Sequence, residues 1–270
     1  MPLWVLATDR PPAGGMEAAD THITIRGLVK RFQGNTVYDR FDLDLPRGAI
    51  TSVFGPNGCG KSTLINMISG ILPTDGGEIL FDGKTVAQTR IGYVFQNYRE
   101  ALFPWMRAID NVAYPLALMG VPEAERRRRI DKLVAGFELT FDLHRYPYEL
   151  SGGQQQTVSI MRALVIEPEV LFLDEPFSAL DYEMTLTMRD QLQKVLRETR
   201  TTSLLVSHDL DEAIYLADKV LLLTRRPTRV AAFLDVGVPR PRTPASTTHP
   251  DFTALKAQAL GIFQAAVRGG

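Results

Sequence analysis

The sequence has few of the features that mark secreted, membrane-spanning or nucleic-acid-binding proteins. Its one cysteine, Cys59, cannot form an intrachain disulfide, which fits a reducing compartment. No apolar run approaches the ~20 residues that a membrane helix needs. The 30 Lys and Arg residues balance 31 Asp and Glu residues, so no net field favours nucleic acid or an anionic membrane surface. Partners therefore have to be inferred from motifs.

The first 20 residues do not read as a secretory signal. They carry no early Lys or Arg, and an acid, an arginine and two prolines cut their apolar stretch short. We predict a disordered leader over residues 1–20. The rest of the 270-residue chain, with an apolar content of 45%, can bury a substantial core.

From Thr21 onward, strand patterns and helical patterns alternate. Strands are expected at 21–29, 41–45, 49–54, 77–83, 91–96, 170–176, 202–208 and 219–223. Helices are expected at 61–69 and 152–165, through Gln191 after the strand at 170–176, and at 209–217. A mostly helical insertion is expected at about 106–141. This alternation predicts an α/β fold with a mainly parallel sheet covered on both faces, where ligands bind beyond the carboxyl ends of the strands.

The chain after Asp235 changes character. Residues 236–250 are rich in Pro, Ser and Thr and lack periodicity, which predicts a loop or an extended arm. Residues 252–267 are compatible with a terminal helix that caps the domain or docks on a partner. We therefore separate a tail, 241–270, from the main domain, 21–240.

The first chemical motif is GPNGCGKST, between an expected strand and an expected helix. Its residues are Gly55, Pro56, Asn57, Gly58, Cys59, Gly60, Lys61, Ser62 and Thr63. The glycines allow backbone amides to wrap a phosphate chain, and the helix that follows directs its positive end at the same anion. Lys61 is expected to reach the β- and γ-phosphates of a nucleotide, and the Ser62 hydroxyl to be a ligand of Mg²⁺.

Two acids end the apolar strand that begins at Val170. A carboxylate in such a place carries a desolvation cost unless a cation or a water network shares the site. We assign Asp174 to the metal ion, and Glu175 as the catalytic base that polarises the attacking water.

Two polar residues close other expected strands. Gln96 can ligand Mg²⁺ through its amide and respond to the γ-phosphate. His208 can donate a hydrogen bond to the γ-phosphate while contacting the water beside Glu175, and we place it with the catalytic residues.

A second glycine motif, LSGGQ, opens the helix expected after residue 150. Ser151, Gly152, Gly153 and Gln154 form a second helix terminus suited to an anion. One ATP cannot use both glycine motifs of one chain in this way. Each chain therefore resembles two halves of different ATP sites.

Two other segments leave alternatives open. The run of arginines from Arg126 to Arg129 would spread around a helix, which favours a solvated helix over a nucleic-acid surface. The segment Phe103-Pro104-Trp105 is either buried to seat the helical insertion or exposed to a partner.

With these motifs in view, residues from about Thr21 to Arg242 resemble the ATP-binding subunit of ABC transporters. The loop from Gly55 resembles Walker A, Gln96 the Q-loop, LSGGQ the signature, VLFLDEP Walker B and SALD, which ends at Asp181, the D-loop; His208 resembles the switch histidine. The resemblance implies a P-loop NTPase with a RecA-like core, an antiparallel β-subdomain and a helical subdomain at about 100–165. By position, Phe32 resembles the aromatic that stacks on adenine, with Tyr38 as a second candidate.

Several longer segments of the sequence resemble the ATP-binding subunits of the bacterial importers of nitrate, sulfonate and taurine. They comprise FQNYREALFPWMRAIDNVAYPL, SHDLDEAIYLADKV and the ending VPRPR. Three positions depart from the family's usual text. Thr157 and Met161 follow the signature, which raises the question of how tightly its helix is held, and Asn57 replaces a more frequent serine.

The resemblance implies ATP and Mg²⁺ as cofactors and an ATP-sandwich dimer of two copies in which Asp181 also borders the nucleotide. It further implies membrane permease subunits, an extracytoplasmic solute-binding protein, a peripheral place on the cytoplasmic face of the cell membrane, and no nucleic-acid partner. The alternatives are the ATPase of an exporter or lipid transporter, and an ABC ATPase without a transport role.

Overall fold

The structure, a computed structural model, describes residues 21–178 and 180–268 and contains two β-sheets. The expected leader, residues 1–20, lies outside the described residues, as does Ala179 within SALD. The smaller sheet is antiparallel, in the order β2-β1-β4. Its strands are β1 (Thr21–Phe32), β2 (Asn35–Pro46) and β4 (Gly76–Phe81). The β1–β2 hairpin is longer than the alternating pattern alone predicted.

The larger sheet has the order β5-β6-β7-β3-β8-β9. Its parallel strands are β5 (Ile91–Val94), β6 (Val170–Asp174), β7 (Thr202–Val206), β3 (Ile50–Phe54) and β8 (Lys219–Leu223). The predicted mainly parallel sheet is confirmed. A sixth strand, β9 (Val230–Asp235), runs antiparallel to β8 and was not predicted, because its half-exposed residues show no alternation of burial.

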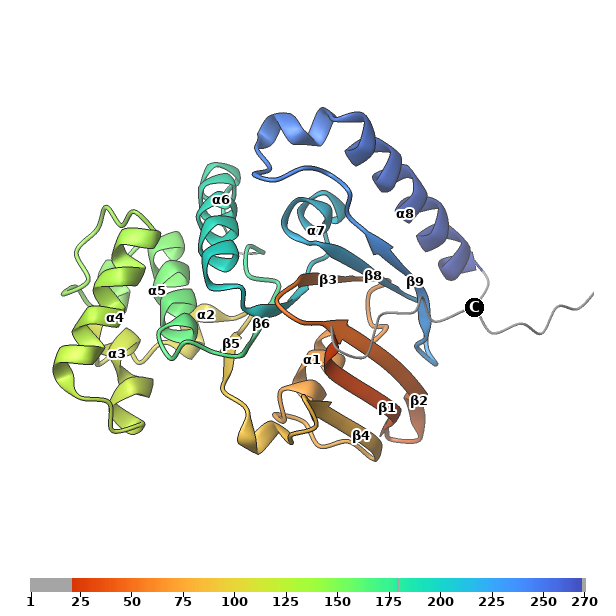
Figure 1. Ribbon diagram of the computed structural model, residues 1–270, viewed down its shortest axis with the longest axis horizontal. Helices are drawn as coiled ribbons and strands as arrows, with labels where there is room; N and C mark the ends of the chain where they lie inside the picture. Colours follow the sequence, from red (N-terminus) through yellow and green to blue (C-terminus); the bar gives the residue numbers. More distant parts are fainter. Residues whose placement is uncertain (1–20, 179, 269–270) are drawn as a thin grey trace, which may run out of the picture.

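Successive residues of the central strands enter two different cores. In β6, Phe172 faces the core shared with the small sheet and α1 (Lys61–Ile68), whereas Leu171 and Leu173 face the helices on the other side. Burial on both faces explains why these strands read as continuous apolar runs. Figure 1 shows α1 between the two sheets, and α6 (Tyr182–Thr199), α7 (Leu210–Leu216) and α8 (Pro250–Arg268) beyond the opposite face. The phosphate loop follows β3, and Asp174 ends β6. Because these strands run in parallel, the loop and the acid lie at the same edge of the sheet.

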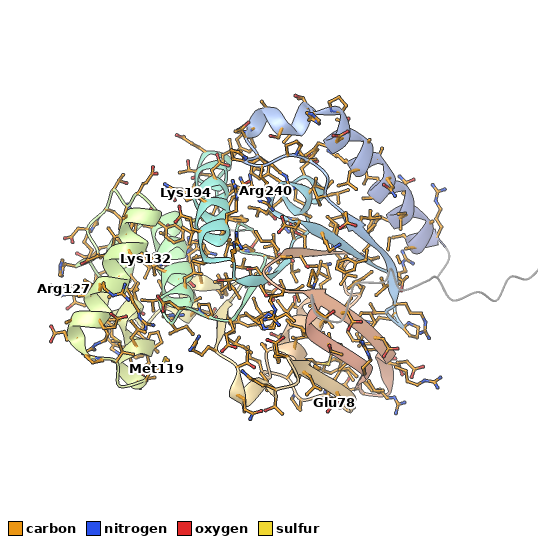
Figure 2. All side chains as sticks on the ribbon, viewed as in Figure 1. Glu78, Met119, Arg127, Lys132, Lys194 and Arg240 are labelled. Atoms are coloured by element: carbon orange, nitrogen blue, oxygen red, sulfur yellow. The ribbon has the colours of Figure 1, made fainter. Side chains whose placement is uncertain are left out.

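A helical group projects from the sheets at the left of Figure 1. It comprises α3 (Ala108–Leu118), α4 (Glu123–Gly136) and α5 (Gly152–Leu164), with the short α2 (Tyr98–Ala101) at its base. Arg127 lies on its outer side, away from both sheets (Figure 2). Glu125 pairs with Arg128 and Arg129, so the arginine run is the solvated helix that the sequence favoured.

The C-terminal segment packs on the main domain. The predicted helix is present as α8. Its side chains Phe252 and Ala259 are buried in the large core. The guanidinium of Arg242, just before it, is buried and donates to the carbonyls of Ile214, Tyr215 and Ala217. Burial lowers the pKa of Arg242 to about 10. This segment is therefore anchored by a buried cation on backbone oxygens. None of the described helices is both long and apolar enough to cross a bilayer.

Helix α6 continues to Thr199, whereas the sequence placed its end near Gln191. Its apolar stripe extends through Leu192, Val195 and Leu196, which are all buried. Arg200 then adopts a left-handed conformation with φ 49 and ends the helix.

Candidate active site

The loop from Gly55 to Gly60 connects β3 to α1 and has the geometry of an anion cradle. Gly58 and Gly60 have φ values of 74 and 114, which favour glycine. The Lys61 ammonium folds over the loop and donates to the carbonyls of Gly55 and Pro56 at 2.9 and 3.2 Å. Those carbonyls hold the lysine over the position where a phosphate chain would lie against the amides.

Tyr38 supports this loop from below. A side chain at Gly60 would approach Val37 to 2.7 Å, and the Tyr38 hydroxyl donates to the Gly60 carbonyl at 2.9 Å. The Tyr38 ring is fully buried. The alternative that Tyr38 stacks on adenine is therefore wrong, because no face of the ring is free.

The expected metal residues meet at the end of β6. The Ser62 hydroxyl donates to Asp174 Oδ1 at 3.1 Å. Asp174 is buried, and desolvation raises its pKa, with a further increase from the charge of Glu175. A buried carboxylate beside a hydroxyl is a hard-oxygen pair that suits Mg²⁺, which would offset the desolvation. Ser62 and Asp174 thus fit a magnesium ion bound with the phosphates.

Two residues that follow separate strands, Gln96 and His208, converge on the carboxylate of Glu175. Gln96 Nε2 donates to Glu175 Oε2 at 2.9 Å, and His208 Nδ1 lies 3.5 Å from the same oxygen. Glu175 itself has φ 46 and its amide donates to the Val206 carbonyl. This left-handed turn points the side chain to the edge of the sheet beside Asp174. A carboxylate at this edge can act as a base toward a water molecule.

Gln96 has a contact with Glu175 in addition to its expected role. Its amide nitrogen bonds to Glu175, so its carbonyl oxygen is the atom left for a metal ion. In this arrangement Gln96 links the metal region to the expected base.

The signature motif forms the start of α5. The Ser151 hydroxyl accepts from the Gln154 amide at 3.3 Å, and Gln154 Oε1 accepts from the Ser151 amide at 3.0 Å. This capping box uses the side chains and leaves the amides of Gly152 and Gly153 at the helix terminus. Across residues 21–178 and 180–268, no hydrogen bond joins residues 151–154 to the loop at 55–63.

Both signature glycines are required by close packing. A Cβ at Gly152 would lie 2.7 Å from the Tyr98 hydroxyl, and one at Gly153 would lie 2.5 Å from Met184. Tyr98 begins α2, shortly after Gln96, and Met184 lies in the first turn of α6, after Asp181. The signature is therefore wedged between the segments that follow the Q-loop and the D-loop.

Thr157 and Met161 are buried side chains of the signature helix. The Thr157 hydroxyl donates to the Gly153 carbonyl at 3.0 Å and lies 3.8 Å from the Met188 sulfur. Met161 is fully buried. At these two positions, where the chain departs from the usual sequence of the family it resembles, both side chains are buried.

Two further predicted residues, Asp181 and Phe32, lie at the start of α6 and at the end of β1. Asp181 Oδ1 accepts from the Met184 amide at 2.8 Å and caps α6, which is a structural role within this chain. Phe32, at the tip of the β1–β2 hairpin, is 41% exposed, and Lys30 Nζ lies 5.2 Å from its ring centroid.

The segment Phe103-Pro104-Trp105 has one aromatic that packs on the helical group and one that is exposed. Phe103 packs on Tyr114 with centroids 4.9 Å apart, whereas Trp105 is 73% exposed. Asn111 fixes the turn, because its amide group donates to the Phe103 carbonyl and accepts from the Phe103 amide. Arg162 of the signature helix donates to the Ala101 carbonyl at 2.6 Å. The exposed tryptophan is thus tied to the helix that carries the signature.

The sequence analysis missed Gln156 and Asn111. Gln156 Nε2 donates to the Pro176 carbonyl at 2.6 Å and links the signature helix to the turn after Glu175. Both side chains are fully buried. A polar residue inside an apolar helical pattern was the available signal, but one sequence does not show which backbone group it meets.

The chain is similar to known proteins of one family. The family model described as "ABC transporter" matches residues 38–178. The aliphatic sulfonates import ATP-binding protein SsuB of Bacillus subtilis is 35% identical over 249 residues, with 92% of this chain and 94% of that protein covered. The Fe(3+) ions import ATP-binding protein FbpC of Escherichia coli K12 is 37% identical over 231 residues, with 83% of this chain and 64% of that protein covered.

Solved structures have the same fold. The cbiO1 protein of Clostridium perfringens, part of an ABC transporter complex, matches with a TM-score of 0.74 at 27% identity, with 88% of this chain and 95% of that chain covered. The ATP-binding cassette MJ0796, solved as a dimer in a post-hydrolysis state with ADP and Pi, matches with a TM-score of 0.68 at 28% identity, with coverages of 79% and 98%.

Proposed function

This chain belongs to the ABC transporter family, as an ATPase subunit of the importer type that uses ATP with Mg²⁺, and we propose that two copies close head-to-tail over two ATP molecules. The observation that carries the proposal is the separation of the two glycine motifs within the chain. The start of α5 offers amides at a helix terminus but has no bond to its own phosphate loop. The Ser151 end of one copy then caps the γ-phosphate held by Lys61 of the other.

In the proposed reaction, this chain's residues divide the work. Lys61 and the loop amides bind the phosphates, and Ser62, Asp174 and the Gln96 carbonyl hold Mg²⁺, which neutralises charge on the phosphate oxygens. Glu175 accepts the proton of the attacking water, and His208 orients that water and the γ-phosphate. Loss of the bridging phosphate lets the dimer reopen.

Phe32 is proposed to stack on the adenine ring. We expect Phe32→Ala to weaken ATP binding by about 1 kcal/mol, roughly 5- to 10-fold in Kd, because one base–aromatic contact is lost. The kcat for hydrolysis should stay near the wild-type value, since the phosphates are held elsewhere. Phe32→Trp is the matched control and should retain affinity; equal Kd values for all three proteins would refute the contact.

The partners are proposed to be membrane permease subunits, reached at the cytoplasmic face, with an extracytoplasmic solute-binding protein that acts through them. The exposed apolar side chains of Trp105, Leu118 and Met119 mark the docking surface on the helical group. Arg162 of the signature helix donates to the Ala101 carbonyl, close in sequence to Trp105, so closure of the dimer would move that surface. Nitrate, sulfonate, taurine or a similar small solute is the proposed cargo.

Co-purification with the permeases tests this surface. We expect Trp105→Asp to remove most of the retained permease while leaving ATP affinity unchanged, because a charge replaces an exposed apolar anchor. Ile71→Asp is the matched control, since Ile71 is an exposed apolar residue outside the helical group. Permease retention by Trp105→Asp would contradict the docking surface. The reconstituted complex then shows which solute stimulates hydrolysis.

A further inference from the structure

Helix α7 carries a buried acid to which the proposed reaction assigns no role. Glu212 is 9% exposed and lies between apolar neighbours such as Leu210, Ala213 and Ile214, which bury in the same core. Burial raises the pKa of the Glu212 carboxyl to about 7. An acid in such a place is costly unless its hydrogen bonds are satisfied.

The hydrogen-bond partner of this carboxylate is Ser207, the residue before His208. Ser207 is fully buried, and its hydroxyl donates to Glu212 Oε2. The same hydroxyl oxygen accepts from the Asp209 amide at 3.0 Å and lies 3.0 Å from the Asp209 carbonyl. Ser207 therefore ties the residues on both sides of His208 to α7.

A serine hydroxyl has a single proton, so it serves one acceptor at a time. When Glu212 is a carboxylate, the Ser207 proton points to Glu212. When Glu212 is protonated, its own O–H can donate to Ser207, and the serine proton turns to the Asp209 carbonyl. A bond between Glu212 and Ser207 exists in both arrangements.

The other charges that face Glu212 come from two elements. Arg189 of α6 favours the ionised form, and its guanidinium carbon lies 3.7 Å from the Tyr215 ring centroid. On the loop itself, His208 also favours the ionised form and Asp209 opposes it. Among the described residues, Ser207 is the one that hydrogen-bonds the carboxylate.

We propose that Glu212 is a positioning residue that fixes the His208 loop for ATP hydrolysis through the Ser207 hydroxyl. His208 Nδ1 lies 3.5 Å from Glu175, so a small shift of the loop changes the place of the imidazole beside the expected base. The effect should fall on turnover and not on ATP binding, because within residues 21–178 and 180–268 no hydrogen bond joins Glu212 to the loop at 55–63. The inference rests on the role proposed above for His208.

A double-mutant cycle tests the proposal. We expect Glu212→Ala and Ser207→Ala each to lower kcat about 10-fold, with the KM for ATP within twofold of wild type, since misplacement of a catalytic group costs rate. The double variant should be no worse than either single variant, because the two residues act through one bond. Glu212→Gln, whose amide can accept from or donate to Ser207, should recover most of the rate.

Asp211→Asn, a neighbouring acid of α7 that pairs with Lys256, is the control and should keep wild-type kcat. Thermal melting of each variant with ATP shows that it is folded and binds nucleotide. Multiplicative losses in the double variant, or a wild-type rate in Glu212→Ala, would overturn the proposal. His208→Ala in the same assay separates the two levels: a wild-type rate overturns the role of His208 and this inference with it, whereas a low rate with a failed cycle overturns this inference alone.

Discussion

Glu175→Gln is expected to lower kcat for ATP hydrolysis by about 10²- to 10³-fold, because the residue loses the carboxylate that accepts the proton of the attacking water. The amide keeps the shape of the side chain and can still contact Gln96 and His208. ATP binding should therefore survive, and the closed dimer should accumulate. Phosphate release and size-exclusion chromatography with ATP measure the two effects.

Glu138→Gln is the matched control for this change. Glu138 is an exposed acid that pairs with Lys194 on the surface. Its variant should hydrolyse ATP at the wild-type rate and show no trapped dimer. Steady-state hydrolysis near the wild-type rate in Glu175→Gln would show that another group acts as the base.

Ser151→Arg is expected to abolish hydrolysis while a single chain still binds ATP with unchanged affinity. Ser151 is exposed at the start of α5 and has no bond to its own phosphate loop. An arginine there removes the helix cap and fills the terminus that would receive the partner's γ-phosphate. The effect should appear only at the step that needs two chains.

Combining this change with Glu175→Gln isolates that step. Glu175→Gln alone should form an ATP-dependent dimer, and the double variant Ser151→Arg/Glu175→Gln should stay monomeric at the same ATP occupancy. Thr85→Arg is the control, because Thr85 is another exposed hydroxyl residue at the start of a short helix. Equal losses of ATP binding and turnover in Ser151→Arg would argue against a signature that acts across a dimer.

Most of the fold could be predicted because its signals are local. The apolar strands β6 and β7 are buried on both faces, so their composition alone marks them as central strands. Strand β9 and the full lengths of β2 and α6 were missed. Their bounds depend on pairing with β8, on the small sheet and on the core against which Leu196 packs, none of which is local in sequence.

The candidate site divides in the same way. The sequence determined the phosphate loop, the acids, the signature and the family, because each motif needs fixed residue types at fixed spacing along one segment. Only the tertiary structure decided which residues touch. It buried Tyr38 beneath Gly60 and directed the Gln96 amide nitrogen to Glu175.

The buried acid of α7 shows the physical reason. Glu212 is one acid among 31 Asp and Glu residues, and its sequence neighbours do not reveal that it meets Ser207. Its environment is set by the packing of α6, α7 and the strand that ends at Val206, and burial raises its pKa to about 7. Motifs record chemistry that is continuous along the chain, whereas desolvation and contacts between distant segments exist only after the chain has folded.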